Sequence, residues 1–144
     1  MTAAAMTTHS NRARTPASTS SPPLYLAGRC NIGAAEIARR RRFGHLGLAV
    51  SVALLLALLA SDAPRESRLL LFFPAAGSAI GYLQARLRFC AAFALLGMFN
   101  FGALGRGERV ADPVALLRDR LSAAAIVAAS AVIGMAVALA ATLI

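Results

Sequence analysis

Four apolar stretches separated by arginines limit the folds that are open to this chain. They cover residues 43–60, 69–83, 89–104 and 121–144, and the outer two hold 18 and 24 residues. A helix crosses the roughly 30 Å hydrocarbon core of a bilayer with about 20 apolar residues, and 18 is within the usual range. The pattern therefore predicts an all-α, four-span transmembrane helical bundle with spans at about residues 43–61, 68–84, 88–105 and 121–144.

The composition favours the same environment. Hydrophobic residues make up 58% of the chain, and the mean hydropathy is +0.66, which is too apolar for a soluble domain of this size. The net charge of +9 comes from 15 arginines without a lysine. Because these cations border apolar segments, we expect the lipid bilayer with its anionic headgroups as the partner, and no nucleic acid.

The first 42 residues divide into two parts. Residues 1–23 are rich in Thr, Ser, Ala and Pro and lack an apolar run, which predicts a disordered tail. Residues 24–42 predict a cytoplasmic amphipathic segment at the membrane interface, with Asn31 as a helix N-cap and Glu36 in an early turn. The segment ends in Arg39, Arg40, Arg41 and Arg42, which cover every side of a helix and so stay in the headgroup region.

Part of this segment carries a resemblance. Asn31-x-Gly33-x-x-Glu36, followed by Arg40 and Gly44 before an apolar run, resembles the start of a short two-helix inner-membrane domain. That domain occurs alone or attached to rhodanese sulfurtransferases. The chain departs from the pattern at position 37, which is basic in that domain, and lacks the domain's Cys-Pro-containing end.

A second resemblance concerns the whole chain. With Gln84-Ala85-Arg86, Phe89-Cys90 and Asn100-Phe101-Gly102, it is similar to a group of uncharacterised small bacterial multi-pass membrane proteins. Neither resemblance implies a reaction.

Small residues predict where the helices pack. Gly77 and Gly81 form a small-xxx-small pair in the second stretch, and Ser130 and Gly134 repeat the spacing in the fourth. Asn100 is a candidate for a hydrogen bond between helices. These residues predict packing within the bundle or, as the alternative, a homo-oligomer. The fourth helix is expected to open at Asp112-Pro113, where Asp caps and Pro occupies the first turn.

The arginines also predict orientation. The cluster before the first span places that end in the cytoplasm, and four spans return the C-terminus to the same side. The turn carrying Arg86 and Arg88, between the second and third spans, is then cytoplasmic as well. We therefore expect the bacterial cytoplasmic (inner) membrane, with both termini cytoplasmic. A twin-arginine export signal at residues 40–43 is the competing interpretation, but three later apolar segments favour an uncleaved first span.

The chemistry-bearing residues are few. All six acids lie outside the apolar stretches, and no nucleophile, acid–base pair or phosphate-binding loop is recognisable, so we expect no enzyme. Cys30 and Cys90 with His45 make too few ligands for a metal, and no cofactor is expected. The leading hypothesis is a structural or accessory membrane protein that packs against itself or a larger membrane partner. The alternatives are a thiol-dependent sulfur carrier or redox protein using Cys30 and Cys90, where neighbouring arginines favour the reactive thiolate, and an oligomeric channel.

Overall fold

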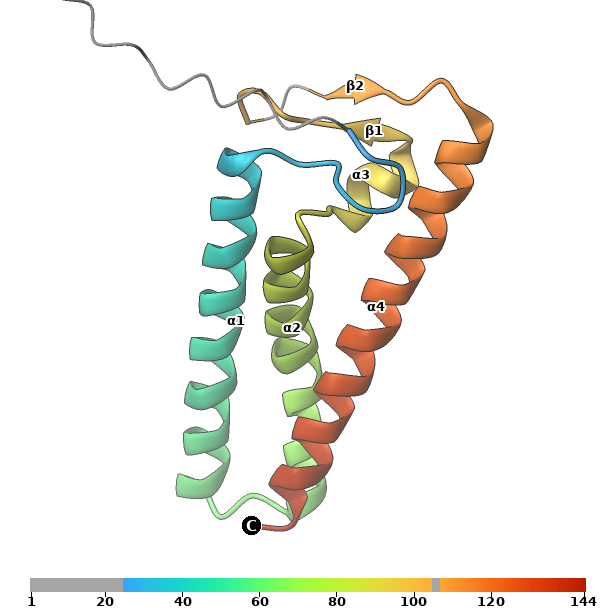
Figure 1. Ribbon diagram of the computed structural model, residues 1–144. Helices are drawn as coiled ribbons and strands as arrows, with labels where there is room; N and C mark the ends of the chain where they lie inside the picture. Colours follow the sequence, from blue (N-terminus) through green and yellow to red (C-terminus); the bar gives the residue numbers. More distant parts are fainter. Residues whose placement is uncertain (1–24, 105–106) are drawn as a thin grey trace, which may run out of the picture.

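Three long helical elements form an elongated bundle in the computed structural model, which describes residues 25–104 and 107–144 (Figure 1). They are α1 (Ala34–Ala60), the 3₁₀ helix η1 (Arg65–Leu71) that continues directly into α2 (Phe72–Leu87), and α4 (Pro113–Thr142). The chain runs down α1, returns through η1 and α2, and runs down again through α4. The tail predicted for residues 1–23 lies outside the described residues.

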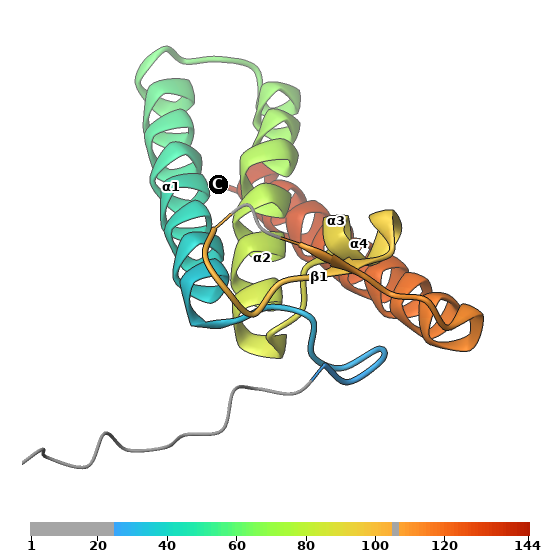
Figure 2. The same cartoon turned by 90° about the horizontal axis from the view of Figure 1, so that it is seen from above.

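A small cap covers the end of the bundle at which α1 begins. It consists of the leading segment (residues 25–33), α3 (Ala91–Leu96), β1 (Met98–Phe99) and β2 (Glu108–Arg109). The strands β1 and β2 pair antiparallel, and Ile32 of the leading segment forms a parallel bridge with Asn100. Seen from above, these pieces cross the helix ends (Figure 2).

The predicted third span is wrong, although the predicted helical fold class is confirmed. Of residues 88–105, only the six of α3 are helical, because Gly97 adopts a left-handed conformation with φ of 66° and ends the helix. The backbone of Asn100 then pairs with the leading segment, through Asn100 N–H to Asn31 O at 2.8 Å and Gly33 N–H to Asn100 O at 2.7 Å. Among the helices of residues 25–104 and 107–144, α1 and α4 are each long and apolar enough to cross a membrane, and α2 alone, with 16 residues, is too short, so the four-span prediction is also wrong.

The end of α4 packs against the start of the second helical element. The last turn of α4 packs against η1, where Leu71 is buried with Ala138 and Ala141. Arg68, which is 8% exposed, donates from Nη1 to the carbonyl of Ala141 at 3.5 Å. This contact lies at the opposite end of the molecule from the start of α1 (Figure 1). The C-terminus thus lies at the opposite end of the molecule from Arg39–Arg42, whereas the sequence predicted both on one side of a membrane.

Small residues set the distance between α1 and α2. A Cβ atom added at Gly81 would lie 2.6 Å from the backbone nitrogen of Gly44, and one at Gly47 would lie 2.8 Å from that of Ser78. The Ser78 hydroxyl donates across the same contact to the carbonyl of Gly44 at 2.8 Å. The two backbones thus touch directly, an approach that larger side chains would prevent.

Candidate functional site

Five polar side chains meet where the cap joins α1 and α2, and we call them the polar cluster. Asn31 comes from the leading segment, Glu36 and Arg40 from α1, Gln84 from α2, and Cys90 from the turn before α3. Asn31 and Cys90 are 0% exposed, Glu36 is 1% exposed and Gln84 is 6% exposed. Buried polar groups of this kind require partners, so their contacts define what the cluster does.

Asn31 fastens the cap through the backbone of Cys90. Its Oδ1 accepts from Cys90 N–H at 2.6 Å, and its Nδ2 donates to the Cys90 carbonyl at 3.0 Å. The predicted N-cap role of Asn31 is wrong. Gly33 occupies the cap position of α1 without a side-chain hydrogen bond, because the amide of Asn31 is engaged with Cys90.

Arg40 contacts both Cys90 and Glu36. Its Nη2 donates to Cys90 Sγ at 2.8 Å and lies 3.8 Å from Glu36 Oε2. Arg39 approaches the other carboxylate oxygen, with Nη1 3.8 Å from Glu36 Oε1. Within the described part of the chain, both Glu36 oxygens, Arg40 Nε and Gln84 Oε1 are buried without a hydrogen-bond partner. The cluster is therefore compact and paired in charge, but incompletely hydrogen-bonded.

The arrangement places one thiol against a guanidinium in a closed space. Cys30, which precedes Asn31 directly, is half-buried, and neither cysteine forms a disulfide. Over residues 25–104 and 107–144, no group of three metal-ligating side chains is present. The contacts thus tie the cap to the bundle and hold Cys90 away from solvent.

A second polar anchor holds the leading segment on α4. Asp119 is 0% exposed and accepts from the Tyr25 hydroxyl at 2.8 Å and from Gly28 N–H at 2.6 Å. The hydroxyl of Ser122 donates to the Gly28 carbonyl at 2.8 Å. Burial and the neighbouring Asp119 carboxylate raise the pKa of Tyr25 above its ordinary value of 10.0.

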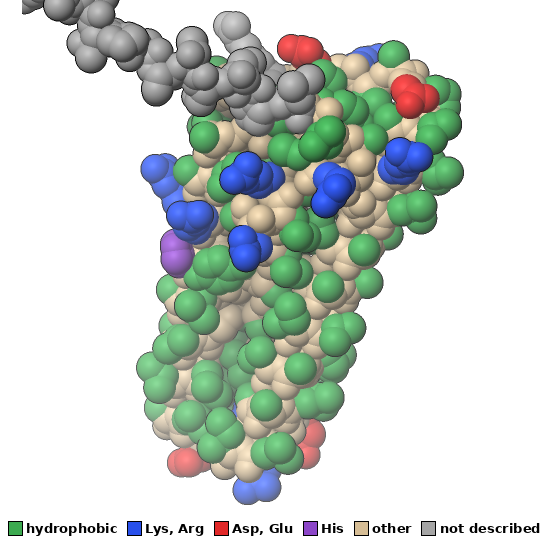
Figure 3. Space-filling view, viewed as in Figure 1, with side chains coloured by type: hydrophobic (Ala, Val, Ile, Leu, Met, Phe, Trp, Pro, Cys, Tyr) green, Lys and Arg blue, Asp and Glu red, His purple; other side chains and the backbone are tan. Residues whose placement is uncertain are grey.

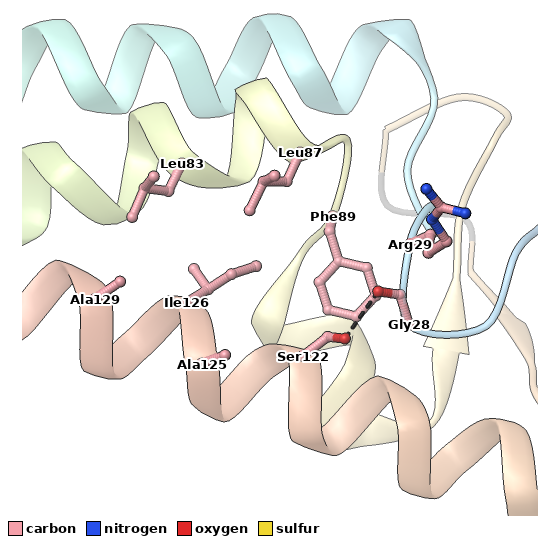
Figure 4. A pocket seen from close by; sticks show the side chains of 9 residues that line it. All are labelled: Gly28, Arg29, Leu83, Leu87, Phe89, Ser122, Ala125, Ile126 and Ala129. Atoms are coloured by element: carbon pink, nitrogen blue, oxygen red, sulfur yellow. Dashed lines mark hydrogen bonds between the residues drawn. The ribbon is translucent and has the colours of Figure 1, made fainter.

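Two grooves run between the helices. The α1–α2 groove has a volume of about 460 Å³, and the α2–α4 groove one of about 340 Å³. Figure 4 shows the α2–α4 groove beneath the leading segment, with Leu83, Leu87 and Phe89 facing Ile126 across it, beside the Ser122–Gly28 hydrogen bond. Both grooves are mainly apolar, and each has an arginine and a polar side chain in its lining, Arg29 and Ser122 in the α2–α4 groove and Arg40 and Gln84 in the α1–α2 groove.

Charge is divided unequally between the ends of the molecule. Figure 3 shows arginines gathered on the upper part of one face, with a broad apolar region below them. Ten of the twelve arginines that the structure describes belong to the cap or to the adjoining helix turns: 29, 39, 40, 41, 42, 86, 88, 109, 118 and 120. Only Arg65 and Arg68 lie at the η1 end.

The structure distributes the predicted packing residues among different roles. Gly134 touches α2, since an added Cβ would lie 2.7 Å from that of Ala76, and Ser130 donates within its own helix to the Ile126 carbonyl. Gly77 faces open space, with nothing within 4 Å of an added Cβ. Asn100 bonds locally to Gly102 N–H and the Ala103 carbonyl, so the expected side-chain bond between helices is absent from the described contacts.

Sequence reasoning missed Glu36, Gln84 and Asp119 as buried residues. A signal for Glu36 was present, because residues 36, 40, 44, 47 and 51 recur at helical spacing and form one stripe of α1. The small residues of this stripe, Gly44, Gly47 and Ser51, lie on the side of α1 that faces α2. Glu36 and Arg40 belong to the same stripe and therefore lie on that side too. Asp119 offered no such signal, since its partners come from a distant segment.

The polar cluster, the apolar helices and the arginine-rich cap are together typical of an integral membrane protein. No family model, curated protein or solved structure matches the chain.

Proposed function

We propose that this protein is a multi-pass integral membrane protein with a structural or accessory role, crossing the bacterial inner membrane three times through α1, η1–α2 and α4. The observation that carries the proposal is the exposure of its apolar helices. Large apolar side chains on all three elements are exposed, including Leu46 at 60%, Phe73 at 69% and Val132 at 69%. A soluble protein buries such helices, but only 11% of the most apolar window of α1 and 28% of that of α4 are buried.

The lengths support three crossings. The apolar part of α1 (residues 43–60) and that of α4 (residues 121–142) extend about 27 and about 33 Å at about 1.5 Å per residue, close to the thickness of the hydrocarbon core. The element η1–α2 is continuous over residues 65–87, so it is long enough although α2 alone is short. With three crossings, the excess of arginines at the cap places the cap in the cytoplasm and the C-terminus in the periplasm.

A structural role follows from what the buried polar groups do. The polar cluster and the Asp119 anchor both join the cap to the helices, and the thiol of Cys90 is enclosed. This arrangement supports a rigid cytoplasmic cap on a membrane stem, which suits an accessory protein that presents a surface to a larger membrane partner.

Topology reporters test the proposal. A reporter that works only in the periplasm is expected to be active when it is fused after Ile144. A reporter that works only in the cytoplasm is expected to be active when it is inserted at Gly107. Extraction of membranes with alkaline carbonate should leave the protein in the pellet. Release into the supernatant, or both reporters on one side, would contradict the three-crossing arrangement.

A further inference from the structure

The α1–α2 groove is open beside Gly77. Gly77 lines it, and a Cβ added there would meet nothing within 4 Å, whereas Gly81 one turn later is closed against α1. The residues beside it are large, apolar and exposed, including Phe43, Leu46 and Val50. The groove is thus a recess in the apolar surface of the helices.

The end of the groove towards the cap is cationic and polar. Arg40 and Gln84 line that end, and each has one buried polar atom, Nε and Oε1, without a hydrogen-bond partner among the described residues. Phe43 and Leu46 are shared with an adjoining hollow of about 230 Å³ that Arg39 and Arg42 complete. Glu36 pairs with Arg39 and Arg40, but Arg42 has no ion pair within residues 25–104 and 107–144.

We infer that the α1–α2 groove binds one acyl chain of an anionic phospholipid, whose phosphate lies against Arg42 and Arg39. This inference rests on the proposed membrane function. An apolar recess with cationic side chains at the headgroup level matches an amphiphile with one negative end. The acyl chain covers Gly77 and Gly81, and the phosphate supplies Arg42 with the counter-ion that the described residues do not provide.

A second copy of this chain fits the groove less well. A symmetric side-by-side pair of copies uses the same surface on each, so Arg39 and Arg42 of one copy would face those of the other. Like charges brought together repel, and Glu36, which is buried and already lies near both Arg39 and Arg40, is not among the lining residues of the groove. A lipid phosphate removes this repulsion instead of adding to it.

Photolabelling of the full-length protein tests the inference. The protein is placed in nanodiscs of phosphatidylglycerol containing a trace of a phosphatidylglycerol with a diazirine in mid-chain, and labelled peptides are mapped by mass spectrometry. We expect labelling to concentrate on the peptides that contain Val50 and Gly77. Gly77→Phe places its Cβ in open space and its ring in the groove, and it should reduce that labelling about tenfold, which corresponds to the loss of the affinity of about two buried methylene groups.

Matched variants and lipids separate the outcomes. Ala129→Phe fills the α2–α4 groove instead and should leave labelling at Gly77 unchanged. Arg42→Gln should lower labelling of the Gly77 peptide, because the variant lacks the charge that holds the phosphate. A phosphatidylcholine probe should label this peptide less for the same reason, since its head group has no net negative charge. Even labelling of all three helices, or no effect of Gly77→Phe, would overturn the inference while leaving the topology result intact. A dimer that Gly77→Phe converts to a monomer would identify a second copy as the occupant and also overturn it.

Discussion

At the residue scale, Asn31 joins the leading segment to the turn that follows α2. Its amide satisfies both backbone groups of Cys90, and all of these atoms are buried. Asn31→Ala leaves the buried N–H of Cys90 unpaired, which costs about 1–3 kcal/mol, whereas the Cys90 carbonyl still accepts from Ala94 N–H at 3.1 Å. We expect a large fall in the midpoint of thermal unfolding, measured by circular dichroism in detergent.

Asn100→Ala is the matched control because it removes the same atoms at another place in the cap. Among the described contacts, the Asn100 side chain bonds only to Gly102 and Ala103. Both partners are exposed and lie two and three residues further along the chain. Its loss should cost about 1 kcal/mol, the usual net value of one hydrogen bond. Equal destabilisation by the two variants would show that Asn31 has no special role in fastening the cap.

The two cysteines are expected to differ in reactivity. Cys90 is wholly buried and accepts a hydrogen bond from Arg40, whereas Cys30 is half-buried in the leading segment. A maleimide should therefore label Cys30 in the folded protein and Cys90 only after denaturation, with Cys30→Ser leaving no fast site. Mild oxidation should produce no link between them. Rapid labelling of Cys90, or a Cys30–Cys90 disulfide, would favour the thiol-dependent alternative.

The free energy of unfolding is expected to depend on pH in the alkaline range because of Tyr25. Its pKa is raised in the folded protein by burial and by Asp119, while the unfolded chain ionises near 10.0. Above that pH the unfolded state loses its proton first, so the contribution of Tyr25 to stability falls as the pH rises. Denaturant unfolding followed from pH 8 to 11 should show this fall. Tyr25→Phe should lower the free energy of unfolding by about 1–2 kcal/mol at pH 8, and its stability should fall less between pH 8 and 11. A pH dependence of the variant parallel to that of the unchanged protein would exclude Tyr25 as the cause.

On the scale of elements, the close contact between α1 and α2 depends on Gly81 and not on Gly77, which lies one turn earlier in α2. Gly81→Ala would force its Cβ against the backbone of Gly44 and Arg40, at 2.6 and 2.9 Å, and so separate the helices. Overpacking of this kind typically costs about 1–3 kcal/mol. Gly77→Ala meets open space and should stabilise α2 by about 0.5–1 kcal/mol through helix propensity. Unfolding in sodium dodecyl sulfate titrations compares the two, and equal effects would remove Gly81 from the helix contact.

Helix ends were predictable where the signals are local. Asp112 was expected to cap the last helix, and its carboxylate accepts from the N–H groups of Val114 and Ala115 at 3.1 and 3.2 Å. Residues 89–104 were misjudged because hydropathy measures apolarity without regard to backbone conformation. Gly97 ends α3, and the partner of Asn100 comes from Asn31, far away in the chain. A pairing of that kind leaves no periodic pattern in the sequence.

The polar cluster was predictable only in part for the same reason. Glu36 and Arg40 share a helix face with Gly44, which the sequence alone reveals. The approach of Arg40 to Cys90 depends on the turn after α2, where Arg88 adopts a left-handed conformation with φ of 53°. Non-glycine residues seldom occupy that region, so sequence patterns give little warning of it. The thiols were therefore identified as residues of interest without the contact that encloses one of them.

On the scale of the whole molecule, orientation depends on the sum of the arginines at the cap and not on one cluster. After Arg39→Gln, Arg41→Gln and Arg42→Gln, seven described arginines remain at the cap end, against Arg65 and Arg68 at the other. Since the side with more arginine in short loops stays in the cytoplasm, most molecules should keep the original orientation. The reporters after Ile144 and at Gly107 measure the two populations.

A four-span arrangement predicts the opposite result for the same triple variant. There, the outer loops carry six arginines (65, 68, 106, 109, 118 and 120), so removing three arginines of the first cluster leaves the outer side richer and inverts the protein. In the three-crossing protein, further replacement of Arg86, Arg88, Arg118 and Arg120 by Gln leaves Arg29, Arg40, Arg106 and Arg109 on the cap side against Arg65 and Arg68, and the inverted population should rise because the difference between the two sides is small. Inversion by the triple variant alone would show that the first cluster governs insertion and that the cap arginines do not contribute.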